Sequence, residues 1–294
     1  MMTQYILKMI LLVLIPSCMY AKANVYDCFP FFNELELLQI RLDELDDVVD
    51  YFVLVESIET QRGNVKPLYF NENKHLFKKY LSKIIHIKVK ERHPEMQMWD
   101  REHFQRNCIT RGLINCHKDD LIMISDLDEI PRSNIVPCLK KLLQPNFHSK
   151  KKSHHKDIAF ALEQDIFYFQ LNRQTDHGGC WGGSSETTTK WHGTVATTFS
   201  TLKQKNPQHF RILRDQLPCI NNAGWHFTWM GGKDKIRQKL ISVVEGNADG
   251  LTVSDRDLDN WIESHSRILP IDSTFPKYVQ KNQDYLRSID FIAD

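Results

Sequence analysis

The strongest constraint in this sequence is a series of short apolar runs that alternate with stretches of helical periodicity. Tyr51–Val55 and Leu121–Ile124 are almost wholly apolar, as strands buried on both faces of a sheet are. Between Glu34 and Leu45, leucines recur at helical spacing. Such alternation indicates βαβ units, so we predict an α/β fold of Rossmann type, with a mixed, mostly parallel sheet flanked by helices. The other expected strands are Val25–Phe29, Ile84–Val89, Ile158–Leu162, Ile166–Leu171, Trp191–Phe199 and Ala223–Met230, and the other expected helices Asn71–Leu81, Trp99–Asn115, Lys233–Val244 and Asp255–His265.

Composition narrows the class of protein. The chain has 38 Lys and Arg against 37 Asp and Glu, a balance that argues against a nucleic-acid-binding protein. With only 12 Gly and 11 Pro in 294 residues, it is neither collagen-like nor a disordered linker. No internal stretch is long enough to separate two domains. We therefore expect a single globular domain over residues 24–294, either an enzyme or a binding domain.

The first 23 residues have the order of a secretory signal. Lys8 precedes the apolar run Met9–Ile15, and the small residues Ala21 and Ala23 follow. The run is shorter than the roughly 20 residues that span a bilayer. We predict a cleaved signal peptide and a mature protein in the secretory lumen (endoplasmic reticulum or Golgi) or outside the cell. A signal-anchor that associates with the membrane and a buried N-terminal helix are the alternatives. Six of the seven cysteines follow this segment, and the sequence does not decide between disulfides and free thiols.

The clearest chemical motif is Asp126-Leu127-Asp128-Glu129, directly after the apolar run Leu121–Ile124. In open α/β sheets, ligands bind at the carboxyl ends of the strands. Two carboxylates at i and i+2 on extended chain point the same way, and carboxylate oxygens suit Mn²⁺ or Mg²⁺. We predict a divalent metal on Asp126 and Asp128, which would neutralise a diphosphate leaving group. A turn or helix-start cluster is the alternative. A haloacid-dehalogenase-type phosphatase is disfavoured by Ile130-Pro131, which follow the motif.

Six segments of the chain, taken together, match the pattern of a known family. They are Tyr26–Glu34, Asp47–Ser57, Lys66–Phe70, Trp99–Asn107, Ile124–Pro131 and Ala223–Trp229. Over about residues 25–290, the chain resembles family 17 of the glycosyltransferases. The resemblance implies a GT-A-type fold, a UDP-sugar donor and an inverting transfer of N-acetylglucosamine from UDP-GlcNAc to a mannose of an N-glycan-type or glycoprotein acceptor. Transfer with another donor or acceptor and a secreted, non-catalytic carbohydrate-binding relative are the alternatives, and a phosphohydrolase is a third class.

The resemblance assigns roles to the acidic motif. Asp126 and Asp128 match the family's D-x-D and hold the metal or the ribose-diphosphate. Glu129 orients this pair or the acceptor hydroxyl, or is only structural. An inverting transfer also needs a general base that takes the proton of the attacking hydroxyl. Glu129, Asp165 and Glu186 are the candidates, and the sequence does not choose among them.

Alternation along Ala223–Met230 predicts two faces of a strand. His226 is expected as a third metal ligand or a phosphate contact, with a core histidine as the alternative. Trp225 or Trp229 is expected to stack on a sugar ring, with core packing as the alternative. The two expected faces are Trp225, Phe227 and Trp229 on one side and His226, Thr228 and Met230 on the other.

Three further residues are expected to bind the donor. Arg106 lies in the predicted helix Trp99–Asn115, where it would pair with the diphosphate or form a surface ion pair. Glu34 and Glu56 lie at the ends of early elements and are expected to reach the uracil or the ribose. The basic segment His148–Lys156 is expected to be an exposed loop that is not a feature of the family.

Overall fold

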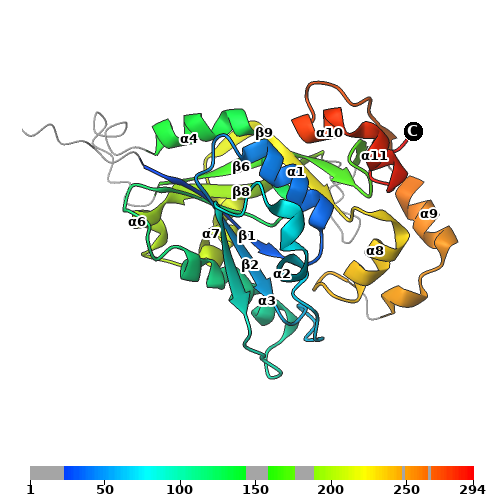
Figure 1. Ribbon diagram of the computed structural model, residues 1–294, viewed down its shortest axis with the longest axis horizontal. Coiled ribbons are helices and arrows are strands. Elements are labelled where there is room, and N and C mark those ends of the chain that lie inside the picture. The colour runs from blue at the N-terminus through cyan, green and yellow to red at the C-terminus, as the bar shows by residue number, and fades with distance from the viewer. Residues whose placement is uncertain (1–22, 144–157, 176–188, 247–248, 264–265) are drawn as a thin grey trace, which may run out of the picture.

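The computed structural model describes residues 23–143, 158–175, 189–246, 249–263 and 266–294. Within these ranges, one ten-stranded mixed sheet is covered by helices (Figure 1). The predicted signal peptide, the basic segment His148–Lys156, Cys180 and Glu186 all fall outside the described residues, apart from Ala23 at the end of the signal. Among the helices described, none is long and apolar enough to cross a membrane.

The sheet joins a parallel part to a mostly antiparallel part. The parallel strands β4, β1, β2 and β3 lie in that order, and β8 continues the sheet by pairing antiparallel with β4. Beyond β8 come β6, β7 and β10, while β9 pairs parallel with β6 and antiparallel with β5. The bounds are β1 Val25–Phe31, β2 Tyr51–Ser57, β3 Ile84–Val89, β4 Leu121–Ile124, β5 Glu129–Pro131, β6 Ala159–Tyr168, β7 Arg173–Thr175, β8 Lys190–Thr198, β9 Cys219–Thr228 and β10 Ser266–Ile268.

The helices are short, and several are extended by 3₁₀ turns. The α-helices are α1 Leu35–Leu45, α2 Tyr69–Asn73, α3 Met98–Asn107, α4 Val136–Leu142, α6 Phe199–Leu202, α7 Pro207–Leu213, α8 Gly232–Leu240, α9 Asp255–Glu263, α10 Lys277–Lys281 and α11 Gln283–Ser288. The 3₁₀ turns are η1 Lys74–Phe77, η2 Cys108–Gly112, η3 Ser133–Ile135, η4 Arg214–Gln216 and η5 Gly250–Thr252. Helices α8 and α9 lie at the end of the molecule opposite α6 (Figure 1).

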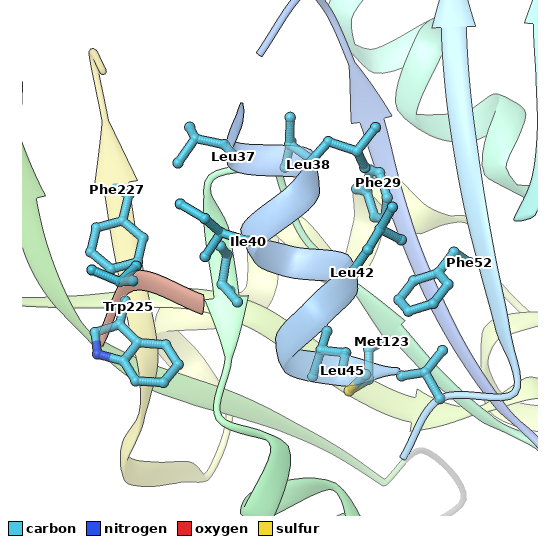
Figure 2. Close-up of a cluster of buried hydrophobic side chains, with 14 of the residues drawn as sticks. Phe29, Leu37, Leu38, Ile40, Leu42, Leu45, Phe52, Met123, Trp225 and Phe227 are labelled. Carbon is cyan, nitrogen blue, oxygen red and sulfur yellow. The ribbon is translucent and has the colours of Figure 1, made fainter. Parts of the chain in front are cut away.

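Both faces of the sheet are buried, and the alternation along β1 shows why. Phe29 and Phe31 point into the apolar cluster around α1, whereas Tyr26 and Cys28 pack against η2 and α7 on the other face. The buried side chains of α1 lie between Phe29 and Phe52 of the parallel strands and Trp225 and Phe227 of β9 (Figure 2). Helix α1 thus bridges the two parts of the sheet, and burial of this apolar surface drives the fold.

The predicted α/β fold with a mixed sheet flanked by helices is confirmed, and the differences are local. The two expected strands Ile158–Leu162 and Ile166–Leu171 are one strand, β6, whose pairing register shifts after Ala161. The expected helix Asn71–Leu81 begins earlier, because the Glu56 carboxylate accepts hydrogen bonds from the backbone N–H groups of Phe70 and Asn71 (2.8 and 3.3 Å). It continues only as the 3₁₀ turn η1.

Candidate active site

A cavity of about 320 Å³ opens where the parallel strands end. Glu34 follows β1, Thr60 and Gln61 follow β2, and Asp126 and Asp128 follow β4, and all five residues line it. This is the edge at which open α/β sheets bind ligands. The opposite side of the cavity comes from the second half of the chain and includes Trp191, Arg211, His226, Thr228, Trp229, Lys239, Ser242, Val243 and Glu245.

The loop that carries the two aspartates is held from behind by Arg41 of α1. Its guanidinium forms a fully buried ion pair with Asp27 of β1 (2.6 Å). The same group donates hydrogen bonds to the backbone carbonyls of Asp126, Leu127 and Glu129 (2.9, 3.0 and 2.9 Å). Three backbone carbonyls of this short loop are therefore fixed by one side chain, which satisfies carbonyls that would otherwise be buried without partners.

Asp126 is clamped by two arginines. Its Oδ1 lies 2.8 Å from Nη2 of Arg106, and its Oδ2 lies 2.7 Å from Nη2 of Arg211. Burial alone would raise the pKa of the Asp126 carboxyl, but the two guanidiniums hold it well below its usual range. Asp126 is thus ionised, oriented and neutralised by the protein itself. The predicted surface ion pair of Arg106 does not occur, since its side chain is buried against Asp126 and Glu102.

Asp128 faces the cavity with a cation and an imidazole beside it. Its Oδ2 accepts a hydrogen bond from Nζ of Lys239 (3.2 Å), and its Oδ1 lies 3.6 Å from Nε2 of His226. Burial alone would lower the pKa of Lys239, but Asp128 and Glu34 raise it, so the amine is charged. Asp128 and His226 therefore present an oxygen and a nitrogen to one point of the cavity.

His226 suits metal coordination chemically. Burial lowers its pKa below the usual value, which keeps the imidazole neutral as coordination requires. Its Nδ1 is buried and has no hydrogen-bond partner, and the ring stacks on Trp191 with centroids 5.2 Å apart. Across the described ranges, no group of three or more His, Cys, Asp or Glu side chains could hold a metal ion. The protein thus offers Asp128 and His226 as a pair, and further ligands would have to come from a bound nucleotide.

Glu129 lies beneath the cavity floor and is fully buried. Its carboxylate accepts hydrogen bonds from the backbone N–H of Asp126 (2.9 Å), from Nε1 of Trp191 (2.6 Å) and from Nη1 of Arg211 (2.8 Å). A carboxylate with this many donors is an anchor for the residues around it. It does not line the cavity, so an acceptor hydroxyl does not meet it.

The residues predicted to bind the donor are distributed unevenly. Glu34 and Trp229 line the cavity. Glu56 does not: it starts α2 and pairs with Nε2 of His86 at 3.0 Å. Trp225 is also away from the cavity, because its ring is packed in the core against Phe227 and its Nε1 donates to the carbonyl of Thr274 (3.1 Å).

The expected alternation along β9 fails at its last residues. The strand ends at Thr228, and Trp229 has a left-handed backbone with φ of 62°, which is unusual for a large side chain. Trp229 therefore turns into the cavity beside His226, while Met230 joins the core with Phe227. The two side chains have exchanged the faces that strict alternation assigned to them.

Of the general-base candidates named from the sequence, the two that the structure describes, Asp165 and Glu129, do not line the cavity. Asp165 pairs with Lys190 (2.7 Å) and Arg132 (3.4 Å) away from it. Glu129 is buried beneath it, and Glu186 is outside the described residues.

The five described cysteines, Cys28, Cys108, Cys116, Cys138 and Cys219, are all free thiols.

Sequence reasoning missed several cavity residues. Trp191, Arg211 and Lys239 line the cavity and contact Glu129, Asp126 and Asp128 respectively, and Lys66 lines it as well. Isolated basic and aromatic residues carry no motif, so nothing in their own segments marks them. The one local signal is helical spacing in α8, which places Lys239 on the inner face beside the buried residues Ile236 and Leu240.

Comparison with known proteins identifies a family. The family model described as "Glycosyltransferase family 17" matches residues 17–172. The β-1,4-mannosyl-glycoprotein 4-β-N-acetylglucosaminyltransferase of Rattus norvegicus is 25% identical over 289 residues, covering 87% of this chain and 52% of the rat protein. The Homo sapiens protein of the same name is 24% identical over 286 residues, covering 86% and 52%. The chain thus spans about half the length of the curated relatives it matches.

Solved structures are similar at a lower level. A mannosyltransferase from Pyrobaculum calidifontis, in complex with GDP-Man and Mn²⁺, is 12% identical with a TM-score of 0.39, covering 92% of this chain and 72% of that one. Glucosyl-3-phosphoglycerate synthase from Mycobacterium tuberculosis is 12% identical with a TM-score of 0.36, covering 88% and 91%.

Proposed function

Because the chain belongs to glycosyltransferase family 17, we propose that it transfers N-acetylglucosamine from UDP-GlcNAc to a mannose of an N-glycan-type acceptor, with inversion at the anomeric carbon. The names of the matched relatives support this donor and acceptor. The observation that carries the proposal is the meeting of Asp126 and Asp128 with Arg211 and Lys239 in one cavity at the strand ends.

Charge is the first reason that this cavity suits a nucleoside diphosphate. Arg211 and Lys239 both line it, so a diphosphate that enters meets two fixed cations. Each cation already balances an aspartate, which keeps both in place before the donor arrives. Arg106 does not line the cavity. Its buried guanidinium orients Asp126 through their ion pair.

A divalent cation, Mn²⁺ or Mg²⁺, would be held by Asp128 and His226, with oxygens of the diphosphate in the remaining positions. It would supply charge stabilisation to the leaving diphosphate. Asp126, fixed between two arginines, would complete the predicted D-x-D by orienting the nucleotide beside it. Glu34 and Lys66 also line the cavity, and we expect them to contact the nucleoside.

We propose that the protein acts in the secretory pathway, in the lumen or outside the cell, because the proposed acceptor is a glycan and residues 1–23 have the order of a signal peptide. A membrane association would run through the same segment. Sequencing the N-terminus of the mature protein decides this part: Asn24 is expected, and Met1 or Met2 on membrane-associated protein would contradict it.

The activity is tested by a screen of donors and acceptors with Mn²⁺, read by product mass and linkage. Transfer from UDP-GlcNAc to a mannose, forming a β linkage, is the expected result. No release of UDP from any UDP-sugar in the presence of glycan acceptors would overturn the proposal. Hydrolysis of a generic phosphate ester without sugar transfer would favour a phosphohydrolase.

Calorimetry tests the metal separately. We expect UDP to bind the wild type more tightly with Mn²⁺ than without it, and His226→Ala to reduce that difference. If His226→Ala binds UDP like the wild type in Mn²⁺ but melts several degrees lower, His226 is a core residue and not a ligand.

A further inference from the structure

We propose that Glu245 is the general base of the transfer reaction, the residue that removes the proton from the attacking acceptor hydroxyl. This inference rests on the proposed function, because an inverting transfer to a hydroxyl needs such a base. It departs from the three candidates that the sequence offered.

Elimination among the carboxylates of the cavity supports this assignment. Six acidic residues line the cavity: Glu34, Glu59, Glu102, Asp126, Asp128 and Glu245. A carboxylate that already neutralises a cation is a poor base, since its charge is stabilised and its pKa falls. A base must also lie where an acceptor enters.

Five of the six have partners. Asp126 is held by two arginines, Asp128 by Lys239, and Glu102 by Arg106. Glu59 is buried, and its Oε1 accepts a hydrogen bond from the backbone N–H of His93 (3.2 Å). Glu34 accepts a hydrogen bond from the backbone N–H of Asn33 (3.0 Å) and lies 3.9 Å from Lys239.

Glu245 is different, for it is exposed at the rim of the cavity and forms no ion pair with any described residue. The backbone around it is nevertheless fixed. The N–H of Val244 donates to Oε1 of Gln61 (2.9 Å), and the carbonyl of Ser242 accepts from the N–H of Arg62 (3.3 Å). The segment after α8 is thereby tied to the loop after β2, across the mouth of the cavity.

The surroundings of Glu245 favour a proton acceptor. Partial removal from water, together with the carboxylates of Glu102 and Asp126, raises its pKa above the usual value, while a hydrogen bond from its own backbone N–H and the charge of Lys239 oppose this shift. A carboxylate with a raised pKa binds a proton more strongly and is a better base. Glu245 lines the same cavity as Asp126 and Lys239.

In the proposed transfer step, one bond to the anomeric carbon forms and another breaks. The acceptor hydroxyl oxygen forms a bond to the anomeric carbon of GlcNAc, and the bond from that carbon to the diphosphate oxygen breaks. UDP leaves with the electron pair of that bond. The proton of the hydroxyl passes to the Glu245 carboxylate and is later released to water. The product carries the opposite anomeric configuration.

Steady-state kinetics of Glu245→Gln, with UDP-GlcNAc, Mn²⁺ and the acceptor that the wild type uses, tests the assignment. The glutamine keeps size and shape but cannot take the proton. We expect kcat to fall by about 100-fold or more, with KM for the donor and the calorimetric affinity for UDP unchanged. Glu245→Asp keeps a carboxylate one methylene shorter and should retain more activity than Glu245→Gln. Asp234→Asn, on the exposed side of α8 and away from the cavity, is the matched control and should transfer like the wild type.

The outcomes separate the two proposals. If the wild type transfers GlcNAc and Glu245→Gln keeps more than about a tenth of its kcat, Glu245 is not the base and the proposed function stands. If Glu245→Gln loses UDP binding along with activity, the residue has a structural or donor-binding role and the assignment is wrong. If the wild type itself does not transfer a sugar, the proposed function fails and the base assignment fails with it.

Discussion

The two walls of the cavity are built in different ways. The strand-end wall, formed by the loops after β1, β2 and β4, is fixed through its backbone: Arg41 binds three of its carbonyls, and the N–H of Ser125 donates to the carbonyl of Cys28. The crossing wall, formed by β8, β9, α7 and α8, is fixed through its side chains. Trp191 stacks on His226, and Arg211 and Lys239 reach across to the aspartates.

The two walls should respond differently to substitution. A wall held through its backbone stays in place when one of its side chains changes, so its motif can be altered without loss of shape. A wall whose side chains hold one another is coupled, and one substitution shifts several neighbours. The cavity combines a rigid acidic wall with a coupled basic and aromatic one, and single substitutions should therefore have different effects on the two sides.

The largest effect is expected where the strand-end wall is anchored. Arg41→Met leaves Asp27 as an unpaired charge, with both side chains fully buried in the wild type. Breaking a buried pair in this way costs about 3–5 kcal/mol of unfolding free energy. Urea denaturation followed by circular dichroism measures it.

The control for Arg41 is Lys79→Met. Lys79 pairs with Asp46 at 3.0 Å, but its side chain is 62% exposed, so the loss should be below about 1 kcal/mol. If the two variants unfold at the same urea concentration, the loop does not depend on Arg41.

The next effect separates the two aspartates of the motif. Asp128→Asn should lower kcat/KM by about 100-fold or more, at least ~2.7 kcal/mol of barrier, with little change in stability, because its partner Lys239 stays partly exposed. Asp126→Asn should lose activity and also about 1–3 kcal/mol of stability, because Arg106 and Arg211 each lose a charged partner.

The stabilisation that Asp126 provides should also depend on pH. The folded-state pKa of Asp126 lies below its unfolded value, so its stabilisation is fully present above that unfolded value, near pH 4, and is lost as the pH falls further. The stability gap between wild type and Asp126→Asn should be constant from about pH 5 upward and should shrink below about pH 4. A gap that does not change with acid would mean that the arginines do not hold Asp126 in solution.

The same contrast explains what the sequence could predict. The apolar runs and the Asp126-Leu127-Asp128 motif are contiguous, so the sheet and the strand-end wall follow from local patterns. The crossing wall joins single residues from distant segments, and its geometry depends on how β8 and β9 pair with the rest of the sheet. Trp229 shows the limit: alternation assigned it to the same face as Trp225 and Phe227, but its left-handed backbone after β9 turns it into the cavity, while those two residues pack in the core.

A smaller effect is expected within the crossing wall. Trp191→Phe keeps an aromatic ring beside His226 but removes the hydrogen bond from Nε1 to the buried Glu129 carboxylate. The loss should be about 1–2 kcal/mol of stability, with a several-fold weaker affinity for UDP, because Arg211 and Asp126 share that carboxylate as a partner. Trp99→Phe, at an exposed ring outside the cavity, is the matched control, and equal effects of the two would show that the wall is not coupled.

The smallest effect is a gain in stability at the expense of binding. Lys66 is buried in the strand-end wall with its Nζ 5.4 Å from the rings of both Phe32 and Tyr69, and burial lowers its pKa to about 8. Since the unfolded chain holds the proton more tightly, a charged Lys66 destabilises the native state below about pH 8, and this penalty disappears as the pH rises through about 10.4. Lys66→Met should therefore raise the unfolding free energy by about 1 kcal/mol at pH 7, and the variant should show no gain in stability near pH 10.5. The same substitution should weaken UDP binding, because it removes a cation that lines the cavity. Thermal melts at the two pH values and a UDP titration measure both effects. A variant that is more stable and binds UDP unchanged would show that Lys66 does not contact the donor.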